Sequence, residues 1–133
     1  MNTTWKITTE HTTADAIAKA RWGLKFIASD PRPLAAVEAA CAAWRDPTPA
    51  NKKAAVKAGN ACSRFHTEHH RVCFGMSCQL DAATAAACAA YAAGADNPDR
   101  EAMCINGAMG AFPYQFPEQH AAYQDPKYYP ASR

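Results

Sequence analysis

Residues 48–73, TPANKKAAVKAGNACSRFHTEHHRVC, carry the pattern that decides the fold. Wound as a single α-helix, this stretch separates two kinds of side chain onto opposite stripes. One stripe holds cations spaced by four, seven and seven residues: Lys53, Lys57, Arg64 and Arg71. The other holds thiols and imidazoles spaced by four, three and four residues: Cys62, His66, His69 and Cys73. The pattern predicts one unbroken helix with a basic outer face and a thiol and imidazole inner face.

Alanine dominates the composition and indicates a helical protein with a thin core. The chain has 32 alanines but only three leucines, and alanine has the highest helix propensity of all residues. Because an alanine side chain buries little area, we expect helix axes near the lower end of the usual range of roughly 8–10 Å. The larger side chains available to fill the core are few: Trp5, Trp22, Trp44, Phe26 and Phe65.

Capping residues and prolines predict where the first two helices begin and end. The first opens at Thr13 or Asp15 and reaches about residue 28. The second opens at Asp30, before two prolines, and stops at residues 46–47 because the residue before a proline avoids the α region. Its apolar stripe is expected at i, i+3, i+7 and i+10, which are Leu34, Val37, Cys41 and Trp44.

Three more helices follow by the same signals. Thr48 caps the long third helix, inside which Gly59 marks either a close contact or a kink. Asp81 opens a fourth helix that ends before Gly94. Its inner face is predicted at Leu80, Ala83 or Thr84, Ala87 and Tyr91. The fifth helix opens at residues 97–98, Asn-Pro, and reaches about residue 108 or 109.

The two ends of the chain differ from this helical middle. Residues 112–133 hold six of the thirteen aromatic residues and four of the nine prolines, so they are expected to form an irregular tail. That tail is either a strap packed across the bundle or an arm that docks onto a partner. Residues 1–12 are expected to form an extended lead-in, in which residues 4–9 are either a short strand or extended chain without a strand partner. We therefore predict a single all-α domain over residues 1–133, an irregular bundle of about five helices with a C-terminal strap.

Charge and hydropathy indicate in which compartment the protein works and what kind of partner it binds. The chain shows no apolar run of about 18 residues and no signal-peptide pattern at its start, so we expect a cytoplasmic protein without a membrane partner. The net charge of +2 divides into +5 for residues 1–75 and −3 for residues 76–133. This asymmetry favours a protein partner with an acidic or nucleic-acid-binding surface, which the cations of the long helix together with Lys52 would contact. A homodimer is also compatible with the sequence.

The cysteines and histidines raise a different hypothesis, a metal or redox site. Zinc prefers these ligands, and both Cys62/His66 and His66/His70 have the i, i+4 spacing that allows chelation from one helix. Cys62 and Cys73 lie about 16 Å apart along the helix, so further ligands would have to come from elsewhere. The main candidates are Cys62, His66, His69, His70, Cys73 and Cys78, and Cys41, Cys88 or Cys104 could supply further ligands. The alternative is a core face in which cysteines pack as small hydrophobic residues.

Catalytic signatures are missing from the sequence. It contains no GxSxG, HExxH, phosphate-binding glycine loop or dinucleotide-binding fingerprint. We therefore expect a protein without enzymatic activity and without a cofactor. A small nucleic-acid-binding protein is a third possibility, since the basic stripe could follow a phosphate backbone.

Three segments together resemble a known family. DPRPLAAVEAACAAW (residues 30–44), AAVKAGNACSRFHTEHH (54–70) and DAATAAACAAYAAG (81–94) resemble the small alanine-rich helical proteins described as immunity proteins of bacterial toxin systems. The likeness rests on Pro33, Ala36, Glu38 and Ala39 and on the alanine-rich helices. It implies a protein that binds and neutralises a toxin. In size and style the chain is also similar to small phage-encoded counter-defence inhibitors of the anti-CRISPR type.

These observations lead to one expectation about function. We expect a non-enzymatic binding protein that inhibits or neutralises another macromolecule, as an immunity protein or a counter-defence inhibitor of a phage or mobile element. The expected contact residues are Lys52, Lys53, Lys57, Arg64 and Arg71. The alternatives are a metal- or redox-responsive helical protein that uses the Cys/His face and a small nucleic-acid-binding protein.

Overall fold

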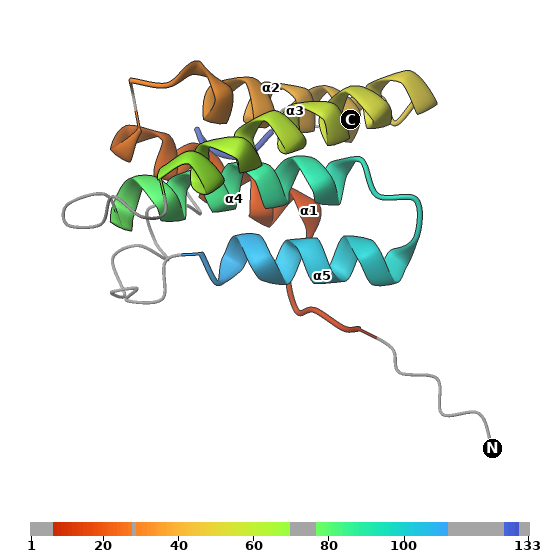
Figure 1. Ribbon diagram of the computed structural model, residues 1–133. Helices are drawn as coiled ribbons and strands as arrows, with labels where there is room; N and C mark the ends of the chain where they lie inside the picture. The colour runs from red at the N-terminus through yellow and green to blue at the C-terminus, as the bar shows by residue number, and fades with distance from the viewer. Residues whose placement is uncertain (1–6, 28, 70–76, 112–126, 131–133) are drawn as a thin grey trace.

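The computed structural model describes residues 7–27, 29–69, 77–111 and 127–130. Within these residues the chain forms five α-helices, one short 3₁₀ helix and no strand, which confirms the predicted all-α bundle (Figure 1). None of these helices is both long and apolar enough to cross a membrane. The elements are α1 (Thr13–Gly23), η1 (Leu24–Phe26), α2 (Pro31–Arg45), α3 (Pro49–His69), α4 (Ser77–Ala93) and α5 (Pro98–Met109).

Helix α4 lies at the centre of the bundle and contacts α1, α2, α3 and α5 (Figure 1). Its side chains are small enough to be covered on nearly every side, and the buried ones are Ala82, Ala83, Ala85, Ala86, Ala87, Ala89, Ala90, Ala92 and Ala93. The prediction of one inner stripe was therefore wrong for this helix, because a helix that is apolar almost all round is buried almost all round. The helix also begins at Ser77, four residues before the predicted Asp81.

Helix α3 runs without a break through Gly59, as the sequence predicts. This glycine is a close-contact point: a Cβ placed there would lie 2.9 Å from Cε1 of Tyr91 on α4. Gly94 has the same role at the end of α4, where a Cβ would lie 2.6 Å from the backbone oxygen of Lys52. Two glycines thus allow α3 and the C-terminal end of α4 to approach closely.

Local capping signals predict most helix starts correctly. The carboxylate of Asp30 accepts a hydrogen bond from the backbone N–H of Arg32, and the Asn97 side chain accepts one from that of Arg100. The Thr48 hydroxyl oxygen likewise accepts one from the backbone N–H of Asn51. These bonds satisfy amide groups that have no partner within the helix.

Two predictions for the first half of the bundle were wrong in detail. Helix α1 begins at Thr13, one of the two predicted starts, and its N-cap is Thr12, because Thr12 and Asp15 bond reciprocally in a capping box. The helix ends at Gly23 and continues as η1, well short of residue 28. In α2, Val37 is buried as predicted, but Leu34 is 49% exposed. The buried face of α2 includes small residues that the apolar stripe omitted, namely Pro33, Ala36, Ala40 and Ala43.

The last described residues of the chain pack against α1. The guanidinium of Arg21 donates hydrogen bonds to the backbone oxygens of Tyr128 and Tyr129, at 3.3 and 2.9 Å. The Tyr129 hydroxyl donates to Asp15 at 2.6 Å, and Pro130 is buried. Residues 127–130 therefore behave as the end of the predicted strap, whereas residues 112–126 and 131–133 lie outside the described part of the chain, as do residues 1–6 of the predicted lead-in.

Lys19 is a charged residue that is fully buried in the core. Its Nζ donates a hydrogen bond to the backbone oxygen of Met109 in the last turn of α5, where helix carbonyls lack partners within the helix. Burial lowers the pKa of Lys19 to about 8, and the negative charge of Asp81 partly opposes this shift. Lys19 thus joins α1 to the C-terminal end of α5, with its charge held in a poorly solvated site.

We expect Gly94→Ala to lower the free energy of unfolding by about 2 kcal/mol, because the added methyl group meets backbone that moves only with the whole helix. Urea denaturation of the variant measures this loss. Gly110→Ala is the matched control, since the nearest atom to its added Cβ is 3.3 Å away and the site is exposed. Equal stability of the two variants would contradict the close approach at Gly94.

Lys19 gives a prediction about pH. Its pKa falls from 10.5 in the unfolded chain to about 8 in the folded protein, so the unfolded state binds more protons between these values. The contribution of Lys19 to stability therefore rises with pH across this window. Between pH 7 and pH 9.5, the free energy of unfolding of the wild type should rise by about 2 kcal/mol relative to Lys19→Met. Urea titrations of both proteins at both pH values provide the measurement, and a constant difference would contradict it.

Candidate partner-binding face

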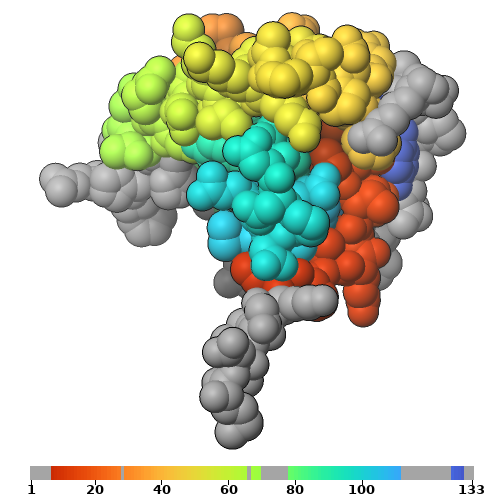
Figure 2. Space-filling model, turned by 90° about the vertical axis from the view of Figure 1, so that its right-hand side faces the viewer, coloured from red at the N-terminus to blue at the C-terminus, as the bar shows by residue number. Residues whose placement is uncertain are grey.

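Three of the predicted contact residues lie together on the outer side of α3. Lys53, Lys57 and Arg64 are all exposed, while Ala55 and Cys62 on the opposite side of the helix are fully buried. We call these three cations the basic face. Lys53 and Arg64 are eleven residues apart, so the basic face extends over about 16 Å of helix. Figure 2 shows α3, coloured yellow to green, forming the upper part of the molecule in that view.

The other two predicted contacts do not join this face in the described structure. Lys52 is only half-exposed and lines a small polar cavity of about 80 Å³ together with Thr13 of α1 and Glu101 of α5. The Thr13 hydroxyl donates a hydrogen bond to Glu101 there, at 2.9 Å. Lys52 therefore lies beside the junction of α1, α3 and α5, and it also lines a shallow hollow together with Lys53. Arg71 lies outside the described residues.

The cations of the basic face are not neutralised within the described part of the protein. None of Lys53, Lys57 and Arg64 forms an ion pair with a described carboxylate. Exposed charges at this spacing are partly screened from one another by salt, since the Debye length is about 8 Å at physiological ionic strength. As far as the described residues show, these three cations can pair with acidic groups on another molecule.

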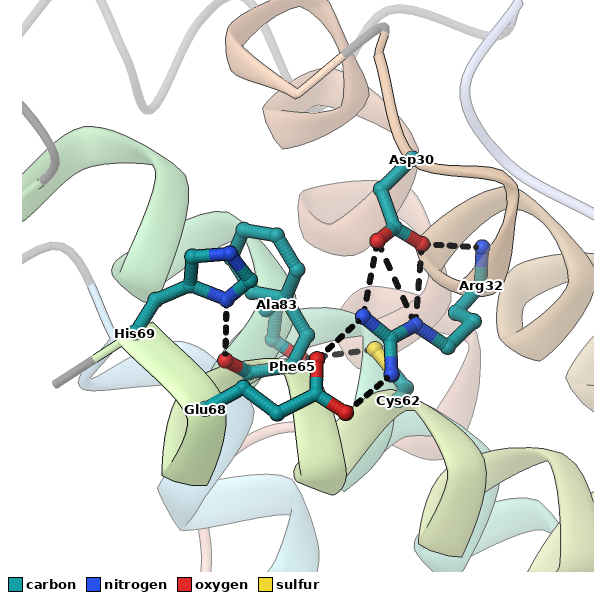
Figure 3. Close-up of polar contacts among 7 residues, drawn as sticks. All are labelled: Asp30, Arg32, Cys62, Phe65, Glu68, His69 and Ala83. Atoms are coloured by element: carbon teal, nitrogen blue, oxygen red, sulfur yellow. Dashed lines mark hydrogen bonds and ion pairs between the residues drawn. The ribbon is translucent and has the colours of Figure 1, made fainter.

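Arg32 on α2, in contrast, is paired with carboxylates of the same protein (Figure 3). Its guanidinium donates hydrogen bonds to Asp30, with the shortest at 2.8 Å, and to both carboxylate oxygens of Glu68 on α3, at 3.1 and 2.9 Å. These bonds hold the pKa of Asp30 and of Glu68 below their ordinary values. Arg32 also lies 5.6 Å from the ring centroid of Phe65. Its charge is committed to joining α2 and α3, so it is not available to a partner.

Two residues of the Cys/His face of α3, Cys62 and His69, have described side chains, and Cys62 is part of the core. Cys62 is fully buried, and its thiol donates a hydrogen bond to the backbone oxygen of Ala83 on α4, at 3.3 Å. Burial raises the pKa of Cys62 to about 12. His69 stacks on Phe65 with ring centroids 4.2 Å apart, and its Nδ1 lies 2.8 Å from the backbone oxygen of Phe65 (Figure 3).

The described residues do not assemble the predicted metal ligands. No group of three or more His, Cys, Asp or Glu side chains in this part of the chain is placed to hold a metal ion. Cys78 is exposed near the start of α4, whereas the thiol of Cys62 is buried. The side chain of His66, and all of His70 and Cys73, lie outside the described structure. Zinc coordination by some of these residues therefore stays a prediction.

Sequence reasoning found the exposed stripe but missed the ion-pair network beside it. Helical spacing alone places Lys53, Lys57 and Arg64 on one face, so the stripe was visible in the sequence. Arg32 and Glu68 are 36 residues apart and belong to different helices, and no local pattern connects them. Comparison of the chain with protein-family models, curated proteins and solved structures finds no match.

The environments of the cysteines predict different reactivities. A thiolate is the species that reacts with iodoacetamide. Burial of Cys62 blocks access of the reagent to the sulfur and, by raising the pKa, lowers the fraction of thiolate. We expect Cys78 to be alkylated at least roughly 100-fold faster than Cys62 in the folded protein. Mass spectrometry of peptides taken at successive times measures both rates.

Concentrated guanidinium chloride provides the control for this experiment, because both cysteines should then react at similar rates. Similar rates in the folded protein would show that the thiol face of α3 opens readily to solvent, contrary to the packing of Cys62 against α4.

Proposed function

We propose that this protein is a non-enzymatic binding protein whose basic face, Lys53, Lys57 and Arg64, contacts an acidic surface of another protein. The observation that supports this proposal is the contrast between two kinds of cation on neighbouring helices. Arg32 is held by two carboxylates, whereas the three cations of the basic face have no described carboxylate partner. Exposed cations without a carboxylate partner contribute more to association with another molecule than to the stability of the fold.

The packing of α3 on its neighbours makes the basic face a rigid surface for binding a partner. Helix α3 packs on α2 and α4, and its buried side carries Ala55, Gly59, Cys62 and Phe65. Because the backbone is fixed along the whole stripe, only the three long side chains lose freedom when a partner binds. A pre-organised surface keeps more of its interaction energy as affinity.

We further propose that binding blocks the partner, as the family resemblance implies. An acidic surface covered by the basic face would be closed to its other ligands, which is how an immunity protein or a counter-defence inhibitor acts without catalysis. Steering between opposite charges would also speed association at low salt. Nucleic-acid binding is the rival use of the same cations, and the experiment below separates the two.

The test compares two variants with the same change in charge. Lys57→Glu/Arg64→Glu reverses two cations of the basic face, and Arg45→Glu/Arg100→Glu reverses two exposed cations elsewhere. The tagged proteins are used to capture partners from nuclease-treated lysate of the source cells. Each captured protein is then purified, and its Kd for the three forms is measured at several salt concentrations.

We expect a partner that wild type and the Arg45/Arg100 variant bind with similar Kd, and that the Lys57/Arg64 variant binds at least about 100-fold more weakly. Circular dichroism should show equal helicity for all forms, because neither substituted face is buried. Equal affinity of the Lys57/Arg64 variant would contradict the assignment of the basic face. Capture from untreated lysate that disappears when nuclease is added, with a steep salt dependence, would favour nucleic acid instead.

A further inference from the structure

A groove between α3 and α4 has a lining unlike the basic face. Its volume is about 380 Å³, which is within the size range of small-molecule sites. Helices α3 and α4 lie side by side here (Figure 1). None of the lining residues carries a charge, and four have hydroxyl groups; the lining is Ser63, Thr67, Ala83, Thr84, Ala87, Cys88 and Tyr91.

The hydroxyl protons in this groove are already committed within the protein. The Tyr91 hydroxyl donates to the side-chain oxygen of Asn60 at 2.6 Å. Since that hydroxyl has a single proton, the 3.1 Å bond between Ser63 and Tyr91 must use the proton of Ser63. The Thr84 hydroxyl donates to the backbone oxygen of Leu80 at 2.9 Å, and the Thr67 hydroxyl donates to that of Ser63 at 3.4 Å.

These commitments leave the groove with hydrogen-bond acceptors and few donors. A hydroxyl oxygen keeps a lone pair after its proton is donated, so Ser63 on α3 and Thr84 on α4 each offer an acceptor from opposite sides. Cys88 adds no negative charge, because burial raises the pKa of its thiol to about 11. The backbone N–H groups of both helix interiors are used in their own helices.

The groove is also rigid on the side formed by Tyr91. The tyrosine ring lies against Gly59, where its Cε1 would be 2.9 Å from an added Cβ. Its hydroxyl is held by Asn60 and Ser63, so both ends of the side chain are fixed. Ala83 and Ala87 lie beneath the groove and are almost completely buried, so its accessible lining consists mainly of the polar side chains.

We infer that this groove binds a small neutral molecule or group that donates N–H hydrogen bonds, such as a carboxamide. A carboxylate or phosphate would meet oxygen lone pairs without a donor. A purely apolar group would cover the oxygens of Ser63 and Thr84 without replacing their hydrogen bonds to water, which costs free energy. The N–H groups of an amide satisfy these oxygens.

The test uses three probes of nearly the same shape: benzamide, acetophenone and benzoate. Each is titrated into ¹⁵N-labelled protein, and the shifts of backbone amides along the groove give the Kd. Benzamide should bind saturably with a Kd in the millimolar range, and both other probes at least fivefold more weakly. Equal binding of the three probes, tighter binding of benzoate, no binding of benzamide, or shifts confined to another part of the protein would overturn the inference.

A pair of variants tests the role of the hydroxyl itself. Thr84→Val keeps the shape of the side chain but removes the oxygen, so benzamide should bind it at least fivefold more weakly while acetophenone binding is unchanged. Thr8→Val, at an exposed position outside the groove, is the control and should leave the affinity for both probes unchanged. Unaltered benzamide affinity in Thr84→Val would show that the hydroxyl does not select the ligand. The basic face plays no part in this experiment, so its outcome is independent of the proposed function.

Discussion

The structure depends on one packing constraint: four helices share the surface of α4. This is possible because most side chains of α4 are single methyl groups, so neighbours approach closely from several directions. Glycines remove even the methyl group where α3 comes nearest, at Gly59 and Gly94. The contribution of each alanine to burial is small, and the stability of the bundle must come from many close contacts rather than from a few large side chains.

Close packing around α4 also explains where the polar groups are placed. Lys19 and Cys62 are fully buried, and each donates a hydrogen bond to a backbone oxygen of another helix. Arg32 joins α2 to α3 through two carboxylates at the edge of the same core. Interior polar groups thus link helices, while Lys53, Lys57 and Arg64 remain on the surface. This division separates the side chains that hold the fold from those proposed to contact a partner.

The sequence predicted the features that depend on neighbouring residues. Caps at Asp30, Thr48 and Asn97 are local, and the basic face follows from helical spacing alone. The burial of α4 was not predictable in this way, because a run of alanines shows no apolar period to mark one side. The bond of Lys19 to α5 and the contact between Arg32 and Glu68 join residues far apart in the chain, and only the three-dimensional arrangement reveals them.

An interior built from the smallest chiral side chain responds to mutation asymmetrically. In a core of leucine and phenylalanine, most substitutions remove volume and leave cavities, which neighbouring groups partly refill. At Ala85 or Ala89, which are fully buried, every replacement except glycine adds atoms where no room exists, and helices must separate to accept them. Most random substitutions at the buried alanines of α4 would therefore force the helices apart rather than create cavities.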